Sequence, residues 1–146
     1  MSTSGTGQLL FAFVRHWSRR PMTSDAMTDG HGRLMQAVEA VASLHARQER
    51  ATVNAVAAEI GIDQSGASRL IKEAAEAGYF MMTSQTVDRR KREASLTDAG
   101  REVLAQAHAW QESVFDALTT DWSTRRRDEF RRAMHDLITQ SHLITK

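Results

Sequence analysis

Residues 52–100 constrain the fold of this 146-residue chain more than any other stretch. Two short segments there carry apolar side chains at the three- and four-residue spacing of amphipathic helices. A single glycine lies between them, and a strand-like segment, a basic loop and a second strand-like segment follow. The close spacing leaves room only for a tight turn between the helices. We therefore expect a helix-turn-helix followed by a β-hairpin.

Gly61 marks the turn between the two predicted helices. It ends the first helix, residues 54–60, because glycine adopts the left-handed conformation at little cost. Ile62 is expected to fill the turn and Asp63 to cap the second helix. The predicted buried face of that second helix consists of Ala67, Leu70, Ile71, Ala74 and Ala75.

The opposite face of the second helix carries small polar groups first and cations further on. Such side chains suit a helix in the DNA major groove, where they contact base edges and phosphates. We expect Gln64 to pair with adenine, Arg69 to contact guanine or phosphate, and Lys72 to contact the backbone. The predicted DNA contacts of this helix are Gln64, Ser65, Ser68, Arg69 and Lys72.

The predicted hairpin has four consecutive cations in its loop. Residues 79–83 are expected to form one strand, residues 86–92 the loop and residues 93–96 the returning strand, after which Thr97 caps the next helix. A run of charges is also typical of a solvated loop. After a helix-turn-helix, however, such a loop indicates a wing that holds cations against DNA. The predicted contacts are Asp88, Arg89, Arg90, Lys91 and Arg92.

The same region resembles the MarR family of bacterial transcription regulators. The family's wing signature, an Asp-x-Arg and then a Leu-Thr-x-x-Gly, is matched by Asp88-Arg89-Arg90 and Leu96-Thr97-Asp98-Ala99-Gly100. Residues 57–62 and 68–71 match its helix-turn-helix in type and spacing, and the terminal helices fit more loosely. From this match we expect Arg90 to enter the minor groove while Asp88 holds it or a neighbouring arginine in place.

Two positions depart from the family pattern. Met82 stands where the family often has a cation. Gly66 lies inside the second helix, where glycine costs about 1 kcal/mol relative to alanine. It is expected either to allow close approach to DNA or to have no role.

Apolar stripes on the flanking helical segments extend the fold beyond the winged region. The predicted class is mainly α with a small β-wing, as one domain over residues 1–146. We expect the winged helix-turn-helix at 33–100, a loop at 21–32, and dimerisation helices at 8–20 and 98–144. Asp121 and Ser123 are the candidate caps of the last helix. A small winged domain cannot cover stripes at both ends. The resemblance implies a homodimer that interleaves these helices and binds an inverted repeat, and packing within one chain is the alternative.

Composition limits the other possibilities. The net charge is only +1, so DNA binding depends on where the cations lie rather than on their total. The chain has no cysteine, which excludes disulfides and thiol chemistry, and no apolar run of membrane-spanning length. No secretory signal is evident, so we expect a cytoplasmic location. These features fit a soluble DNA-binding domain.

Enzymatic chemistry finds little support in the sequence. None of the six histidines forms a His-x-x-x-His pair, and no P-loop, Gly-x-Ser-x-Gly or Gly-x-Gly-x-x-Gly motif occurs. A metal site assembled from distant residues stays open as an alternative. We expect no enzyme activity, no cofactor and no metal.

Function is therefore expected to be transcription regulation by sequence-specific DNA binding, with this protein acting as a repressor. The resemblance also implies a small aromatic or phenolic effector, near Phe13, His16, Trp17, His45 and Trp110, for which core packing is the alternative role. A second function class is a winged-helix protein-interaction module without operator binding. The acidic Glu73 and Glu76 favour this second class, because they would repel phosphate if they faced DNA. The cations at 89–92 favour DNA binding, because an interaction module has no need of them.

Overall fold

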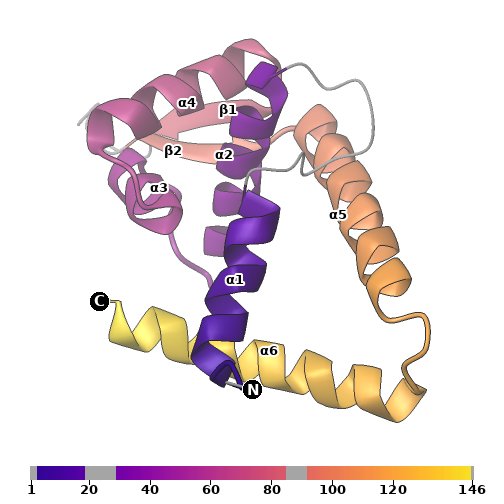
Figure 1. The fold of residues 1–146 in the computed structure, drawn as a ribbon. Coiled ribbons are helices and arrows are strands. Elements are labelled where there is room, and N and C mark those ends of the chain that lie inside the picture. The colour runs from indigo at the N-terminus through magenta and orange to yellow at the C-terminus, as the bar shows by residue number, and fades with distance from the viewer. Residues whose placement is uncertain (1–2, 19–28, 85–91, 146) are drawn as a thin grey trace. The chain divides into compact units, whose positions relative to one another are not determined.

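The computed structural model describes residues 3–18, 29–84 and 92–145. Within these ranges the chain forms six helices and one two-stranded antiparallel sheet (Figure 1). The predicted class, mainly α with a small β-wing, is confirmed. The elements in chain order are α1 Thr6–Ser18, α2 Asp29–Ala46, α3 Val53–Ile60, α4 Gln64–Glu76, β1 Phe80–Ser84, β2 Arg92–Leu96, α5 Asp98–Leu118 and α6 Thr124–Ile144.

The chain divides into two compact units, Met1–Gln111 and Glu112–Lys146. The core of the first unit is built around α2, whose apolar side chains recur every three residues and are almost completely buried at Met35, Val38, Val41 and Leu44. Side chains of α3, α4 and β1 pack against this face. Helix α2 begins at Asp29, so the predicted loop at 21–32 is too long at its C-terminal end. Glycine-rich composition suggested a loop there, but a formed helix extends readily because each added residue gains one hydrogen bond.

The turn of the helix-turn-helix has the expected geometry. Gly61 adopts the left-handed conformation, with φ of 82°, and its N–H donates to the Ala57 carbonyl at 2.9 Å. The Asp63 side chain caps α4 by accepting a hydrogen bond from the Gly66 N–H at 2.8 Å. Ile62 is 37% exposed, so the prediction that it fills the turn is wrong. Its side chain lies beside Gly66, where no side chain is present to cover it.

Gly66 has a structural explanation that the sequence did not reveal. A Cβ atom at this position would lie 2.7 Å from Oδ1 of Asp63, the atom that caps the helix. The glycine therefore leaves space for the Asp63 cap. The gain in capping offsets part of the helix propensity that glycine loses.

The Leu-Thr-x-x-Gly segment joins the hairpin to α5. In the hairpin, Phe80 pairs with Leu96 and Ser84 with Arg92. The Thr97 hydroxyl caps α5 by accepting from the Gly100 N–H at 3.1 Å, and it donates to the Gly78 carbonyl. These bonds explain the threonine, and the glycine three residues later is explained by the Tyr79 backbone, whose carbonyl oxygen leaves no space for a Cβ atom at position 100.

Ion pairs fix α3 and the hairpin against the end of α2. Arg47, just after α2, makes two hydrogen bonds to the Glu59 carboxylate of α3, one of them 3.0 Å long. These bonds raise the pKa of the Arg47 guanidinium, so the arginine stays charged. Arg50 pairs with Glu93 of β2. The segment between α2 and α3 is a connection with one isolated bridge, Thr52 to Glu93.

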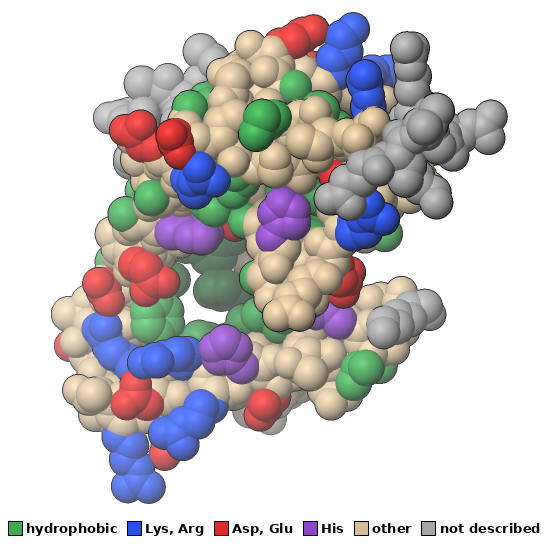
Figure 2. All heavy atoms as spheres, turned by 180° about the vertical axis from the view of Figure 1, so that it is seen from behind, with side chains coloured by type: hydrophobic (Ala, Val, Ile, Leu, Met, Phe, Trp, Pro, Cys, Tyr) green, Lys and Arg blue, Asp and Glu red, His purple; other side chains and the backbone are tan. Residues whose placement is uncertain are grey.

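The second unit contains the end of α5 and all of α6. Ser123 caps α6 by accepting from the Arg126 N–H at 3.1 Å, which agrees with one of the two predicted caps. The rings of Phe115, Trp122 and Phe130 pack together, with centroids 5.4–6.4 Å apart. Figure 2 shows Lys and Arg side chains gathered at its lower left, over the start of α6, where Arg126 stacks on Trp122 at 4.1 Å.

Helices α1 and α6 bury no described residue completely. Each presents large apolar side chains to solvent instead, and the exposed fractions are 63% for Phe11, 54% for Phe13, 45% for Leu137 and 51% for Ile138. Exposed apolar stripes of this extent are typical of surfaces that contact a partner.

Candidate nucleic-acid interface

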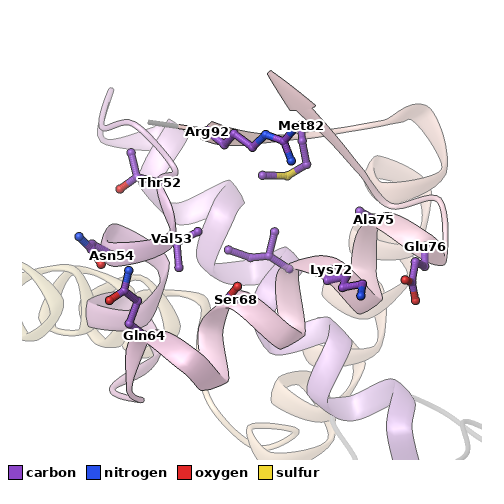
Figure 3. A pocket seen from close by; sticks show the side chains of 11 residues that line it. Thr52, Val53, Asn54, Gln64, Ser68, Lys72, Ala75, Glu76, Met82 and Arg92 are labelled. Carbon is purple, nitrogen blue, oxygen red and sulfur yellow. The ribbon is translucent and has the colours of Figure 1, made fainter. Parts of the chain in front are cut away.

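An open groove of about 920 Å³ lies between α4, the start of α3 and the hairpin (Figure 3). Each turn of α4 contributes to its lining, and the lining residues of this helix are Gln64, Ser68, Ile71, Lys72, Ala75 and Glu76. The facing side consists of Thr52, Val53 and Asn54 from the start of α3 and Met82 and Arg92 from the hairpin. The groove therefore combines apolar with polar side chains, and its described lining residues include two cations and one carboxylate.

All five residues predicted to contact DNA from the second helix are exposed on α4. Gln64, Ser68 and Lys72 line the groove, and a second, shallower hollow is lined by Gln64, Ser65, Ser68 and Arg69. The buried face of the same helix consists of Ala67, Leu70, Ile71 and Ala74, which hold it against the core. Packing thus fixes which side chains α4 presents.

Only one of the five predicted wing contacts falls within the described residues. Arg92 begins β2, is exposed, and lines the groove opposite α4. Asp88, Arg89, Arg90 and Lys91 lie outside the described residues, so their contacts stay predictions.

Sequence reasoning missed Asn54 as a member of this surface. Asn54 is exposed in the first turn of α3 and lines the groove together with Gln64 (Figure 3). The Thr52 side chain caps this helix by accepting from the Ala55 N–H at 3.2 Å. A polar residue two positions after a threonine cap was the available signal, because the first turn of a helix presents free N–H groups that suit phosphate.

Met82 also lines the groove but packs partly against the hydrophobic core. A cation at this position would bury part of its side chain among apolar groups, which is costly for a charge without a partner. The departure of Met82 from the family pattern therefore agrees with its surroundings.

The described part of the chain holds neither a cluster of metal-ligating side chains nor a membrane-spanning helix. No three His, Asp or Glu side chains there lie close enough together to hold a metal ion. None of the helices described is both long enough and apolar enough to cross a membrane.

No family model matches the sequence, and no curated protein matches it. Solved structures do match in fold. MarR is 19% identical, with a TM-score of 0.72, and the match covers 99% of this chain and 95% of that one. BpsR from Bordetella bronchiseptica is 17% identical with a TM-score of 0.59 over 94% of this chain and 95% of that one. CouR from Rhodococcus jostii RHA1 is 21% identical with a TM-score of 0.52 over 72% and 71%.

These likenesses establish the fold: the chain has the winged-helix fold of MarR transcription regulators. The predicted resemblance is confirmed at this level.

Proposed function

We propose that this protein is a sequence-specific, double-stranded DNA-binding transcription regulator, and that it represses from an inverted-repeat operator as a homodimer. The observation that carries this proposal is the polar face of α4, which core packing aims outward beside a groove that also holds Arg92. A convex helix with amide, hydroxyl and cationic side chains matches the major groove, and the hairpin beside it matches the adjacent backbone. The proposed role is binding, not catalysis.

A second copy of the chain would complete the molecule. The apolar side chains exposed on α1 and α6 form the proposed interface, and the dimerisation helices at 8–20 and 98–144 are part of the same proposal. A two-fold axis would present two copies of α4 to successive major grooves, so the target would be an inverted repeat.

A small aromatic effector is part of the proposal. BpsR is described as regulated in its DNA binding by 6-hydroxynicotinic acid, and CouR as bound to p-coumaroyl-CoA. In this chain Trp17 of α1 contacts Trp110 of α5, with ring centroids 6.5 Å apart, and also contacts Phe13 and His16. An aromatic ligand that binds in this cluster would separate α1 from α5. Since α1 belongs to the proposed dimer interface, the ligand would thereby alter the geometry of the dimer.

Titration with genomic DNA fragments at two salt concentrations tests the proposal. We expect a subset of fragments to bind tightly, with affinity that falls as salt rises because phosphate contacts release counterions. The bound fragments should share an inverted repeat. If the protein binds no fragment at low salt, the result would contradict the proposal and favour the alternative function, a winged-helix protein-interaction module.

Gln64 and Lys72 are expected to contribute in different ways. Gln64→Ala should weaken binding to the recovered operator by about 1–3 kcal/mol with little change on unrelated DNA, because an amide can read a base edge. Lys72→Gln should weaken both duplexes alike and flatten the salt slope by about one unit. Fluorescence anisotropy with both duplexes measures these effects, and equal losses on both duplexes for both variants would contradict the assignment.

Arg90→Ala tests the wing. If Arg90 enters a narrow, A·T-rich minor groove, its removal should weaken operator binding by about 1–3 kcal/mol and leave the melting temperature unchanged. Arg125→Ala, an exposed arginine on α6, serves as the control for loss of one positive charge. Unchanged affinity of the Arg90 variant at moderate salt would refute a role for Arg90 in the minor groove.

A further inference from the structure

Among the described side chains that line the groove, Glu76 alone is acidic. It lies one helical turn beyond Lys72 on α4, and Figure 3 shows both side chains on the same stretch of that helix. Residues four apart on a helix share one face. The surface that presents Lys72 to a DNA backbone therefore presents Glu76 beside it.

The stability of α4 does not account for this carboxylate. Glu76 is the last residue of α4, where the negative end of the helix dipole disfavours an acidic side chain. The last turn of α4 contains no basic residue, and Glu76 is exposed. Lys72, four residues earlier, offsets only part of this cost, because a pair with the cation first is the less favourable order, and Glu76 adds nothing to the core.

A DNA backbone in the groove would meet charges of both signs. Lys72 from α4 and Arg92 from β2 would attract the phosphates, whereas Glu76 would repel them. The interaction of each of these charges with a phosphate is short-ranged, because salt screens it beyond about 8–10 Å. The effect of Glu76 is thus confined to DNA seated in this groove.

We propose that Glu76 limits the affinity of this protein for the DNA backbone of any sequence. The inference rests on the proposed DNA binding and assigns Glu76 a regulatory role in the same groove. Non-specific binding depends almost entirely on phosphate contacts, so a repelling charge shortens the time spent on unrelated DNA. Base contacts from Gln64 and Arg69 then sustain binding at the operator.

The test compares Glu76→Gln with Glu73→Gln in the full-length chain. Both substitutions remove one exposed acidic charge from the end of α4, but Glu73 is not among the residues that line the groove. Fluorescence anisotropy with an operator fragment and an unrelated duplex, at several salt concentrations, gives the affinities and salt slopes. We expect Glu76→Gln to bind both duplexes about two- to fivefold more tightly and to steepen the salt slope by up to about one unit. Glu73→Gln should show less than half of this change.

Four outcomes would overturn the inference while leaving the proposed DNA binding intact. The first is unchanged affinity of Glu76→Gln, and the second is an equal effect of Glu76→Gln and Glu73→Gln. The third is weaker operator binding by Glu76→Gln, which would show that Glu76 makes a favourable base contact. The fourth is an effect of Glu76→Gln that disappears when Lys72→Gln is also present. In that last case Glu76 would act by positioning Lys72 and not on the phosphates. A wild-type chain that binds neither duplex at low salt would refute the proposed function itself.

Discussion

Replacing Leu137 with glutamate is expected to abolish tight operator binding without changing any proposed DNA contact. Leu137 lies on the exposed apolar side of α6 and is 45% exposed in the single chain. In the proposed dimer it would be covered, so the variant would bury a carboxylate without a partner. Each half-site supplies only part of the binding energy, and the dimer adds the two on one frame. Affinity should fall at least about 10³-fold, to the non-specific level.

Sedimentation and operator titration of the same Leu137→Glu sample measure the two consequences together. Thr139→Glu is the matched control, since residue 139 is exposed and polar and lies roughly opposite residue 137 on the helix. The control should remain dimeric and bind the operator normally. A wild-type chain that sediments as a monomer while it binds a single half-site tightly would contradict the dimer proposal.

Gly100→Ala is expected to give the largest loss of stability among single-methyl changes in the winged region. Gly100 is buried, and a Cβ there would lie 2.3 Å from the Tyr79 carbonyl oxygen. Because that neighbour is backbone, the hairpin or α5 must shift, which would strain the Thr97 bonds that join them. We expect the free energy of unfolding to fall by about 2–3 kcal/mol. The melting temperature should fall by roughly 5–12 °C at matched protein concentration.

The control for this prediction is a glycine with open space around it. Gly7 lies in α1, and a Cβ there would meet nothing within 4 Å. Gly7→Ala should leave the melting temperature unchanged or raise it, because alanine favours the helix. If thermal denaturation showed the same melting temperature for Gly100→Ala and the wild type, the close packing of α5 on the hairpin would be wrong.

Local chemistry made the centre of the fold predictable. Gly61, Asp63 and Thr97 each act through bonds within a few residues, so their roles as helix end or cap follow from the sequence. The polar face of α4 was predictable for a similar reason, since helical periodicity separates Gln64 and Ser68 from the buried residues.

Features that depend on the placement of individual side chains, or on how far a helix extends, were not predictable. The start of α2 at Asp29 overrides a loop-like composition, and Ile62 is exposed where it was expected to fill the turn. Asn54 joins the α4 surface only because α3 and α4 meet at the groove. The role of Gly66 could be recognised only from the position of the Asp63 carboxylate, which helical periodicity alone does not specify.

Hydroxyl-radical footprinting on the recovered operator tests the central claim, that two copies of α4 read an inverted repeat. At saturation we expect two protected segments, related by two-fold symmetry and centred on half-sites about one helical turn apart or a multiple of it. As protein concentration rises, the Gln64→Ala variant should require a higher concentration than the wild type and should then protect both segments together. A single protected segment at saturation, or protection unrelated to the repeat, would contradict the claim.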